Sequence, residues 1–204
     1  MVSKAEKHEP GYGPDDFEDP PERLTIPAGG GLVLKRLMVE DAEAYFKHLQ
    51  DNPEHFRQRY EGGWDDTAEK YPDLNSLILS FSDPRNEHRT RLGIWNGDSM
   101  VGSINLTPET ENSMEIGYWI GPNETGHGYA ANATRALVEY AFRNNPQLQE
   151  IYGDVFVGNR ASSRTLEKSG FKLADTFTRI KDGQTQTLWR YTIGREREEL
   201  SLSA

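Results

Sequence analysis

The sequence predicts an α/β protein of the mixed α+β kind, with one central, mixed and mostly antiparallel sheet of about seven strands flanked by helices. Its 204 residues suffice for one domain with its own core. Apolar runs and helical spacings alternate in a way that fits a single sheet. The dipeptide Asn96-Gly97 stands between two apolar runs, which is a strong hairpin signal at the centre of this order.

The N-terminal half supplies one strand and then helices. Residues 31–37 form an apolar run typical of a strand. Apolar residues then recur at helical spacing from Ala42 until Pro53 breaks the helix. Further helical stretches are expected around residues 56–60 and 67–81.

The C-terminal half supplies most of the sheet. Its apolar runs predict an antiparallel meander, two strand-to-helix segments and a closing hairpin. The expected elements are strands at 92–95, 100–106 and 114–120, a helix at 129–144, a strand at 151–157, a helix at 161–169, and hairpin strands at 171–180 and 185–193.

Composition sets the domain limits and excludes several classes of function. Residues 1–22 are rich in Pro, Gly and acidic residues, which predicts a flexible tail before a domain at 23–195 and a short tail at 196–204. No secretory signal or membrane-length apolar run is present, so we expect a cytoplasmic protein. The net charge of −10 argues against nucleic-acid and membrane partners. Cysteine is absent, which excludes disulfides and thiolate chemistry, and the five histidines show no metal-ligand spacing, so no metal is expected.

A glycine-containing loop follows the strand at 114–120 and opens the helix at 129–144. Gly126 and Gly128 let the backbone curl around a ligand, so that amide N–H groups and the positive end of the helix face phosphate oxygens. An ordinary strand-to-helix turn is the alternative. The run from Gly126 to Ala131 also fits a dinucleotide fingerprint formally, but about five residues separate it from its strand, and that strand belongs to an antiparallel meander.

Three segments resemble successive signatures of the RimJ/RimL type of GNAT-superfamily N-acetyltransferases. They are Met114-Glu-Ile-Gly-Tyr-Trp-Ile120, Thr125-Gly-His-Gly-Tyr-Ala130 and Asn159-Arg-Ala-Ser-Ser-Arg-Thr-Leu-Glu-Lys-Ser-Gly-Phe171. The resemblance covers roughly residues 32–193 and implies a transferase that uses acetyl-CoA to acylate an amine. It also implies that the strands at 114–120 and 151–157 splay apart around the pantetheine arm.

The resemblance assigns the cofactor site to the loop and its neighbours, and it places Asn159 and Ser162 near the sulfur. One departure is that relatives usually carry Gln or Arg where this chain has Asn123 and Thr125. The implied cofactor-binding residues are Trp119, Ile120, Thr125, Gly126, His127, Gly128, Tyr129, Ala130, Asn159 and Ser162.

The chemistry needs a base, because an ammonium ion must lose a proton before its nitrogen attacks a thioester. Glu115 lies in an apolar strand, and period-two alternation places it with Gly117 and Trp119 on one face. Half-burial would raise its pKa, which favours a role as a base, direct or through water. Pairing with a buried arginine is the structural alternative.

The sequence leaves several candidates for the acid that protonates the leaving thiolate. Many relatives use a tyrosine, but no tyrosine follows Asn159 closely here. Ser162, another hydroxyl or water would take its place. Asn159, Ser162 and Ser163 are equally well explained as helix N-cap residues.

The acceptor site is expected between residues 49 and 71 and along the C-terminal hairpin. Trp64, Asp65 and Asp66 could receive a cationic amine through carboxylate pairing and cation–π contact, although an exposed loop is the simpler interpretation. His48 and His55 are interpreted as solvated surface. The sequence thus favours acetyl transfer to a primary amine, either a protein N-terminus or a small molecule. A non-catalytic acyl-CoA-binding module, and less so a dinucleotide-binding domain, remain as alternatives, and a homodimer is compatible with the family.

Overall fold

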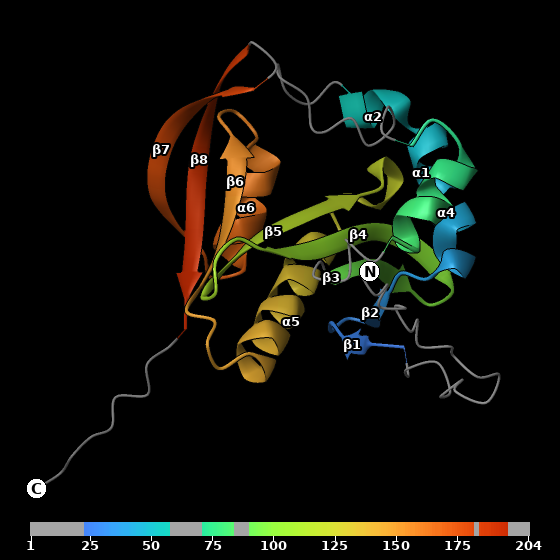
Figure 1. The fold of residues 1–204 in the computed structure, drawn as a ribbon, viewed down its shortest axis with the longest axis horizontal. Helices are drawn as coiled ribbons and strands as arrows, with labels where there is room; N and C mark the ends of the chain where they lie inside the picture. The colour runs from blue at the N-terminus through green and yellow to red at the C-terminus, as the bar shows by residue number, and fades with distance from the viewer. Residues whose placement is uncertain (1–22, 58–70, 84–89, 182–183, 196–204) are drawn as a thin grey trace, which may run out of the picture.

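The structure is a computed structural model, and it describes residues 23–57, 71–83, 90–181 and 184–195. One eight-stranded sheet runs through it in the order β1-β2-β3-β4-β5-β6-β8-β7 (Figure 1). The strands are β1 Thr25–Pro27, β2 Leu32–Arg36, β3 Thr90–Asn96, β4 Ser99–Pro108, β5 Ser113–Ile120, β6 Glu150–Phe156, β7 Lys172–Lys181 and β8 Gln184–Gly194. The helices are α1 Ala42–Asp51, α2 Pro53–Arg57, α4 Leu74–Phe81, α5 Tyr129–Asn144 and α6 Arg160–Lys168, with short 3-10 turns η1 Val39–Asp41 and η3 Pro122–Glu124.

The predicted mixed sheet is confirmed, and it has one strand more than the seven expected. The additional strand is β1, a three-residue edge strand that pairs antiparallel with β2. It is too short to show a periodic pattern, and its pairing with β2 defines it. Every neighbouring pair in the sheet is antiparallel except β5 with β6.

The predicted elements lie within a few residues of their expected positions. The helix expected at 129–144 has those bounds in α5, and the β3–β4 hairpin turns at Gly97, whose φ of 60° is the left-handed conformation that glycine adopts readily. Several predicted segments lie outside the described residues. They are residues 58–60 and 67–70 of the helical stretches expected at 56–60 and 67–81, the turn at 182–183, and the tails at 1–22 and 196–204.

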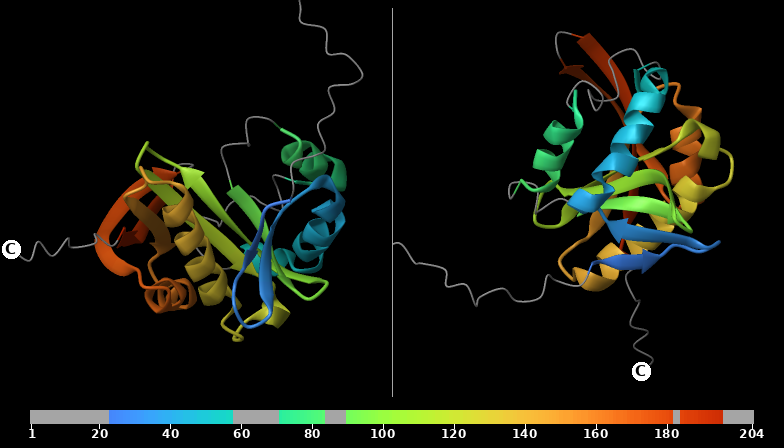
Figure 2. Two further views of the ribbon diagram at one scale, coloured as in Figure 1. Left: turned by 90° about the horizontal axis from the view of Figure 1, so that it is seen from below. Right: turned by 90° about the vertical axis from the view of Figure 1, so that its right-hand side faces the viewer.

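Helices cover both faces of the sheet and create two apolar clusters (Figure 2). One face packs against α5 and α6 through residues such as Leu137, Leu166 and Ile116. On the other face, α1, α2 and α4 form a smaller cluster that includes Leu49 and Trp119. Burial of these two apolar clusters holds the helices on opposite faces of the central strands. Among the described residues, no helix is long and apolar enough to span a membrane.

Candidate active site

The sheet splits at its centre, between β5 and β6. The two strands run parallel and pair only from Ser113 with Glu150 to Glu115 with Tyr152. Beyond that point they diverge, as Figure 1 shows, while β5 continues to Ile120. The expected splaying of these two strands is therefore confirmed. Because the sheet ladder stops there, one edge of β5 faces an opening instead of a neighbouring strand.

The alternation along β5 identifies the backbone groups on that edge. The N–H of Gly121 donates to Val101 O on β4 at 2.9 Å, so odd-numbered residues of β5 direct their backbone groups toward β4. Even-numbered residues direct theirs toward the split. Consistently, the Nε2 of His55 lies 3.0 Å from Ile120 O, on the split side. The split is thus bordered by main-chain polar groups of the even-numbered positions.

The glycine loop ends at this opening. Gly126 and Gly128 have φ angles of 87° and 78°, and a Cβ at either position would meet no atom within 4 Å. Gly128 is the N-cap of α5, no side chain caps the helix, and the first turn closes with the N–H of Asn132 donating to Gly128 O at 3.0 Å. The earlier N–H groups of the helix therefore point out of its N-terminus, where the helix dipole favours an anion.

A cavity of about 300 Å³ joins the loop to the split. Its wall comes from the end of β5, the glycine loop, the first turn of α5, α6 and the end of α2. The lining residues are His55, Phe56, Tyr118, Trp119, Ile120, Glu124, Thr125, Gly126, Gly128, Tyr129, Ala130, Ala131, Asn159, Ala161, Ser162, Arg164, Thr165 and Lys168. All the cofactor-binding residues expected from the sequence are among them except His127, whose exposed ring stacks on Tyr129 with a centroid distance of 5.2 Å.

Three polar side chains meet at the start of α6. The Oδ1 of Asn159 accepts the N–H of Ser162 at 3.0 Å and so caps the helix. The Oη of Tyr118 lies 2.9 Å from the Oγ of Ser162, and its hydroxyl also donates to Ser162 O at 3.2 Å. Since both residues line the cavity, a phenol lies beside the serine that the sequence singled out.

Sequence reasoning missed Tyr118 as part of this group. The family resemblance points to a tyrosine after Asn159, whereas the phenol comes from β5, 44 residues before its serine partner. The usable signal was the alternation itself, because Tyr118 has the opposite parity to Glu115 and so must face the other side of the sheet. Arg164 and Lys168 were also missed, although their spacing of four on α6 places both on one helix face, at the cavity.

Glu115 lies on the opposite face of the sheet from this hydroxyl pair. Its carboxylate has no hydrogen-bond or ion-pair partner in the part of the chain that the structure describes, and it is half-buried. It does not line the cavity. Burial first, and then the negative charges of Asp154 and Glu109, raise its pKa above the ordinary range of a glutamate, while Arg179 and Arg190 oppose this. The expected face and the expected pKa direction are therefore both confirmed.

The neighbours of Glu115 form an ordered polar group on the same face. Tyr152 is directly opposite on β6, and burial together with the charge of Glu115 raises its pKa to about 12, so it remains a phenol at neutral pH. Arg190 donates to both oxygens of Asp154, from Nε at 2.8 Å and from a terminal nitrogen at 2.7 Å. Its guanidinium lies 4.1 Å from the ring centre of Tyr152 and 4.9 Å from that of Phe177. A bidentate ion pair stacked on two rings is a rigid arrangement.

The interpretation of His48 and His55 as solvated surface is wrong. The Nε2 atoms of His48 and His55 lie 2.7 Å and 3.0 Å from the carbonyl oxygens of Met100 and Ile120, and both rings are half-buried. These bonds tie α1 and α2 to the ends of β4 and β5. The periodicity of a short helix could not reveal them, because the acceptors lie 52 and 65 residues away in sequence.

The remaining expectations concern the acceptor and a metal. Trp64, Asp65 and Asp66 lie outside the described residues, so their role stays a prediction. Within the described ranges, no three His, Cys, Asp or Glu side chains form a group that could hold a metal ion. The dinucleotide alternative lacks its structural context, since η3 separates β5 from α5 and β5 is antiparallel to β4.

Comparison with known proteins identifies the class. Residues 31–172 match the family described as Acetyltransferase (GNAT) domain. The uncharacterized N-acetyltransferase YoaA of Bacillus subtilis (strain 168) is 31% identical over 146 residues, which cover 69% of this chain and 79% of YoaA. The uncharacterized protein YkkB of the same organism is 32% identical over 100 residues, 45% of this chain, and the match spans 58% of YkkB. The chain belongs to the GNAT acetyltransferase family and is an acyltransferase.

Solved structures share the fold. RimL, a ribosomal L7/L12 alpha-N-protein acetyltransferase in complex with coenzyme A, superposes with a TM-score of 0.74 at 16% identity over 84% of this chain and 98% of its own. The microcin C7 self-immunity acetyltransferase MccE, in complex with acetyl-CoA and AMP, has a TM-score of 0.70 at 22% identity, covering 82% and 94%. RimJ of Mycobacterium smegmatis, in complex with CoA-disulfide, has a TM-score of 0.68 at 23% identity, covering 88% of each chain. Membership of the GNAT family, which the resemblance implied, is confirmed by the family match, and the fold is shared with the solved RimL and RimJ structures.

Proposed function

We propose that the protein transfers the acetyl group of acetyl-CoA to a primary amine by direct attack of the amine on the thioester. The observation that carries the proposal is the split between β5 and β6, which begins just beyond the Glu115–Tyr152 pair and leads to the uncapped N-terminus of α5. A linear carrier bound in the split would have its phosphates at the loop and its thioester between the strands. The acceptor would then arrive from the face of Glu115.

The residues at the loop fit the diphosphate of the carrier. The backbone at Gly126 and Gly128 is open, so phosphate oxygens can approach the N–H groups there and at the start of α5. Arg164 and Lys168 add positive charge to the cavity wall. The side chains of Asn123 and Thr125 are shorter than those of relatives, and the Thr125 hydroxyl donates to Pro122 O at 2.9 Å, which leaves phosphate binding mainly to the backbone.

Glu115 is the proposed base. When bound, acetyl-CoA supplies the thioester carbonyl that the acceptor nitrogen attacks. Glu115 accepts the ammonium proton, directly or through one water, and its raised pKa brings it closer to the pH at which it works. Backbone N–H groups on the open edge of β5 are the donors available to the carbonyl oxygen as negative charge develops on it.

Ser162 and Tyr118 are the proposed donors to the leaving sulfur. As the C–S bond breaks, the Ser162 hydroxyl gives its proton to the thiolate and takes the proton of Tyr118 through their 2.9 Å hydrogen bond. The phenol is then reprotonated from solvent, and the second proton that the attacking nitrogen loses on becoming an amide is released to solvent. Asn159 acts as a positioning residue, because its side chain fixes the first turn that carries Ser162. The pair would replace the tyrosine that relatives place after this position.

The first test is an acceptor screen with acetyl-CoA that measures release of free thiol. Peptides with free N-termini, aminoglycosides, polyamines and amino acids are supplied as acceptors. Thiol release that depends on the acceptor supports the proposal. Binding of CoA without thiol release in the presence of any acceptor would instead indicate a non-catalytic binding module. A rise in melting temperature with NAD but not with CoA would indicate a dinucleotide site.

The second test locates the phosphate cradle. Gly128→Ala places a methyl group in the open space of the loop, and we expect CoA affinity, measured by calorimetry, to fall about tenfold or more. The matched control is Gly97→Ala, because Gly97 also has a positive φ, of 60°, and open space around it, but lies in the β3–β4 turn. Both variants carry the same kind of backbone strain, of about 1–2 kcal/mol. Equal CoA affinity in the two variants would place the cradle elsewhere.

A further inference from the structure

The acceptor face carries a cation that the proposed acetyl transfer does not use. Strand register places Glu115 and Tyr152 opposite each other, and likewise Asp154 opposite Arg190 and Arg179 opposite Gln186. Tyr152 and Asp154 are two residues apart on β6, and Gln186 and Arg190 are four apart on β8, so all of these side chains share one face. The face therefore runs without interruption from the base on β5 to Arg179 on β7.

One pair of opposite charges on this face is already neutralised. The bidentate contact between Arg190 and Asp154 cancels one positive and one negative charge, and both groups are held in place by it. Glu115 and Arg179 remain as groups of opposite sign, with Glu109 as a further carboxylate close enough to act on Glu115. A molecule bound on this face thus meets a carboxylate at one end and a guanidinium at the other.

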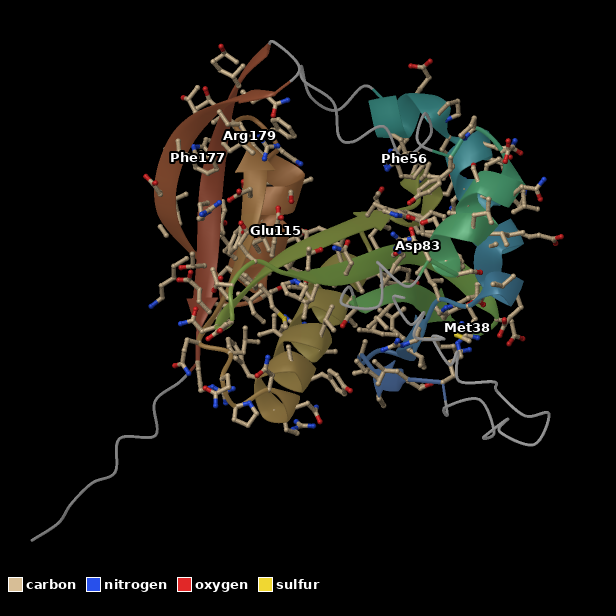
Figure 3. All side chains as sticks on the ribbon, viewed as in Figure 1. Met38, Phe56, Asp83, Glu115, Phe177 and Arg179 are labelled. Atoms are coloured by element: carbon tan, nitrogen blue, oxygen red, sulfur yellow. The ribbon has the colours of Figure 1, made fainter. Side chains whose placement is uncertain are left out.

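Arg179 is oriented for recognition. Its Nε donates to the Oε1 of Gln186 at 2.9 Å, and Gln186 is only 3% exposed, so one edge of the guanidinium is fixed by a buried partner. The two terminal nitrogens have no partner in the described ranges of the chain. Figure 3 shows Arg179 above Glu115 in that view, on the hairpin that β7 and β8 form. Two parallel N–H donors fit a carboxylate with both oxygens engaged.

We propose that the acceptor is a primary amine that also carries a carboxylate, with the carboxylate bound by Arg179 and the amine placed at Glu115. The inference rests on the proposed acetyl transfer and narrows its substrate class. The amine of such an acceptor complements the carboxylates of Glu115 and Glu109, and its carboxylate complements the guanidinium of Arg179, while a polyamine would leave Arg179 unpaired and facing a like charge. Free amino acids, ω-amino acids and peptides with an acidic residue near the N-terminus all have this chemistry.

The experiment compares acceptors that differ only in the carboxylate. Three matched pairs serve: alanine with alaninamide, 4-aminobutanoate with its amide, and a Ser-Glu peptide with a Ser-Gln peptide, both amidated at the C-terminus. Wild-type enzyme should favour the acid of at least one pair by about ten- to a hundredfold in kcat/KM, which is the effect of a charged hydrogen bond. The pair that shows the preference identifies the source of the carboxylate. Preference for the amide in every pair would overturn the inference.

Variants assign that preference to one residue. In Arg179→Gln the acid-to-amide ratio should fall toward one, and in Arg179→Lys, which keeps the charge but loses the planar fork, it should lie between. Arg143→Gln is the control, because it removes a cation near the end of α5 and should keep the wild-type ratio. An unchanged ratio in Arg179→Gln would overturn the assignment.

A second measurement separates this inference from the proposed function. Calorimetry with the enzyme–CoA complex, which cannot react, measures binding of the preferred acid to wild type and to Arg179→Gln. Loss of binding in the variant supports the carboxylate site even if no acetyl transfer is found. Acetyl transfer to amines with no dependence on Arg179, in rate or in binding, would retain the proposed function and reject the inference.

Discussion

Replacing Glu115 by Gln tests whether one face of the sheet supplies the base while the other face binds CoA. The substitution keeps the shape of the side chain and removes the proton acceptor. Removal of a general base typically lowers the rate about 10²- to 10⁴-fold, and we expect the lower part of this range if a water carries the proton. Because Glu115 does not line the cavity, the affinity for CoA should stay within about twofold of wild type.

The size of this effect should depend on the acceptor. At pH 7 about one α-amine in ten is already neutral, whereas about one alkyl amine in 2,500 is, from pKa values of about 8 and 10.4. The rate of Glu115→Gln with an α-amine should therefore recover largely by pH 9, while the rate with an alkyl amine should not. The assay is steady-state thiol release from pH 5 to 9.5. Wild-type activity should fall as the pH drops through the raised pKa of Glu115, and the variant should lack this acidic limb. A variant with wild-type kcat, or one that retains the acidic limb, would refute the assignment.

Stability should respond in the opposite direction to activity. The pKa of Glu115 is higher in the folded state than in the unfolded chain, so folding favours its protonated form. Its contribution is fully present below the unfolded pKa and is lost as the pH rises through the folded pKa. Glu115→Gln should thus raise the Tm at pH 7, and the difference should vanish below about pH 4. A Tm lowered at pH 7 would mean that the carboxylate has a stabilising partner.

Substitutions at four further positions test the hydroxyl pair and two structural contacts. Tyr118→Phe should lower kcat about tenfold at unchanged KM for acetyl-CoA, and Ser162→Ala should lower kcat more. The double variant should be no slower than Ser162→Ala, because both hydroxyls act on the same proton transfer. Additive losses of kcat in thiol-release assays would contradict a shared path. Asn159→Ala should destabilise the protein by about 1 kcal/mol in urea unfolding, while Asn159→Asp retains the cap and most of the stability. Arg195→Ala removes donors to three carbonyl oxygens near the end of α5, at 3.0, 2.7 and 2.6 Å, and should cost about 2 kcal/mol at an unchanged m-value, against no measurable loss for Arg143→Ala.

The local elements could be predicted because each is encoded within a short window. The spacing of apolar residues defined α5, and the Asn-Gly turn defined the β3–β4 hairpin. The parity of Glu115 could also be predicted, since successive residues in a strand alternate between faces. The same rule gave Tyr118 the opposite face. It could not reveal that Ser162 is its partner, because their contact depends on how α6 packs beside the split sheet.

Contacts between distant segments account for what the sequence did not reveal. His48 and His55 are ordinary helix positions until their carbonyl acceptors on β4 and β5 are known. Arg179 lies in a strand of mixed polarity, and it shares a face with Glu115 because of the strand order β5-β6-β8-β7 and the register of those strands. Periodicity determines which face a side chain occupies, whereas strand order determines which other side chains share that face.

In the proposed mechanism, strand β5 links the two halves of the reaction, because successive residues of the strand face opposite sides of the sheet. Glu115 faces the acceptor side, and Tyr118 faces the cofactor side, while the backbone between them borders the split. The base and the leaving-group donor are therefore fixed relative to each other by three residues of extended chain, a separation of about 10 Å along the strand. A thioester that enters between them has the attacking nitrogen on one side and the sulfur on the other, as direct transfer requires. Under the proposed mechanism the split sheet is more than a binding groove, because the strand that borders it carries the groups proposed for both proton transfers in one rigid element.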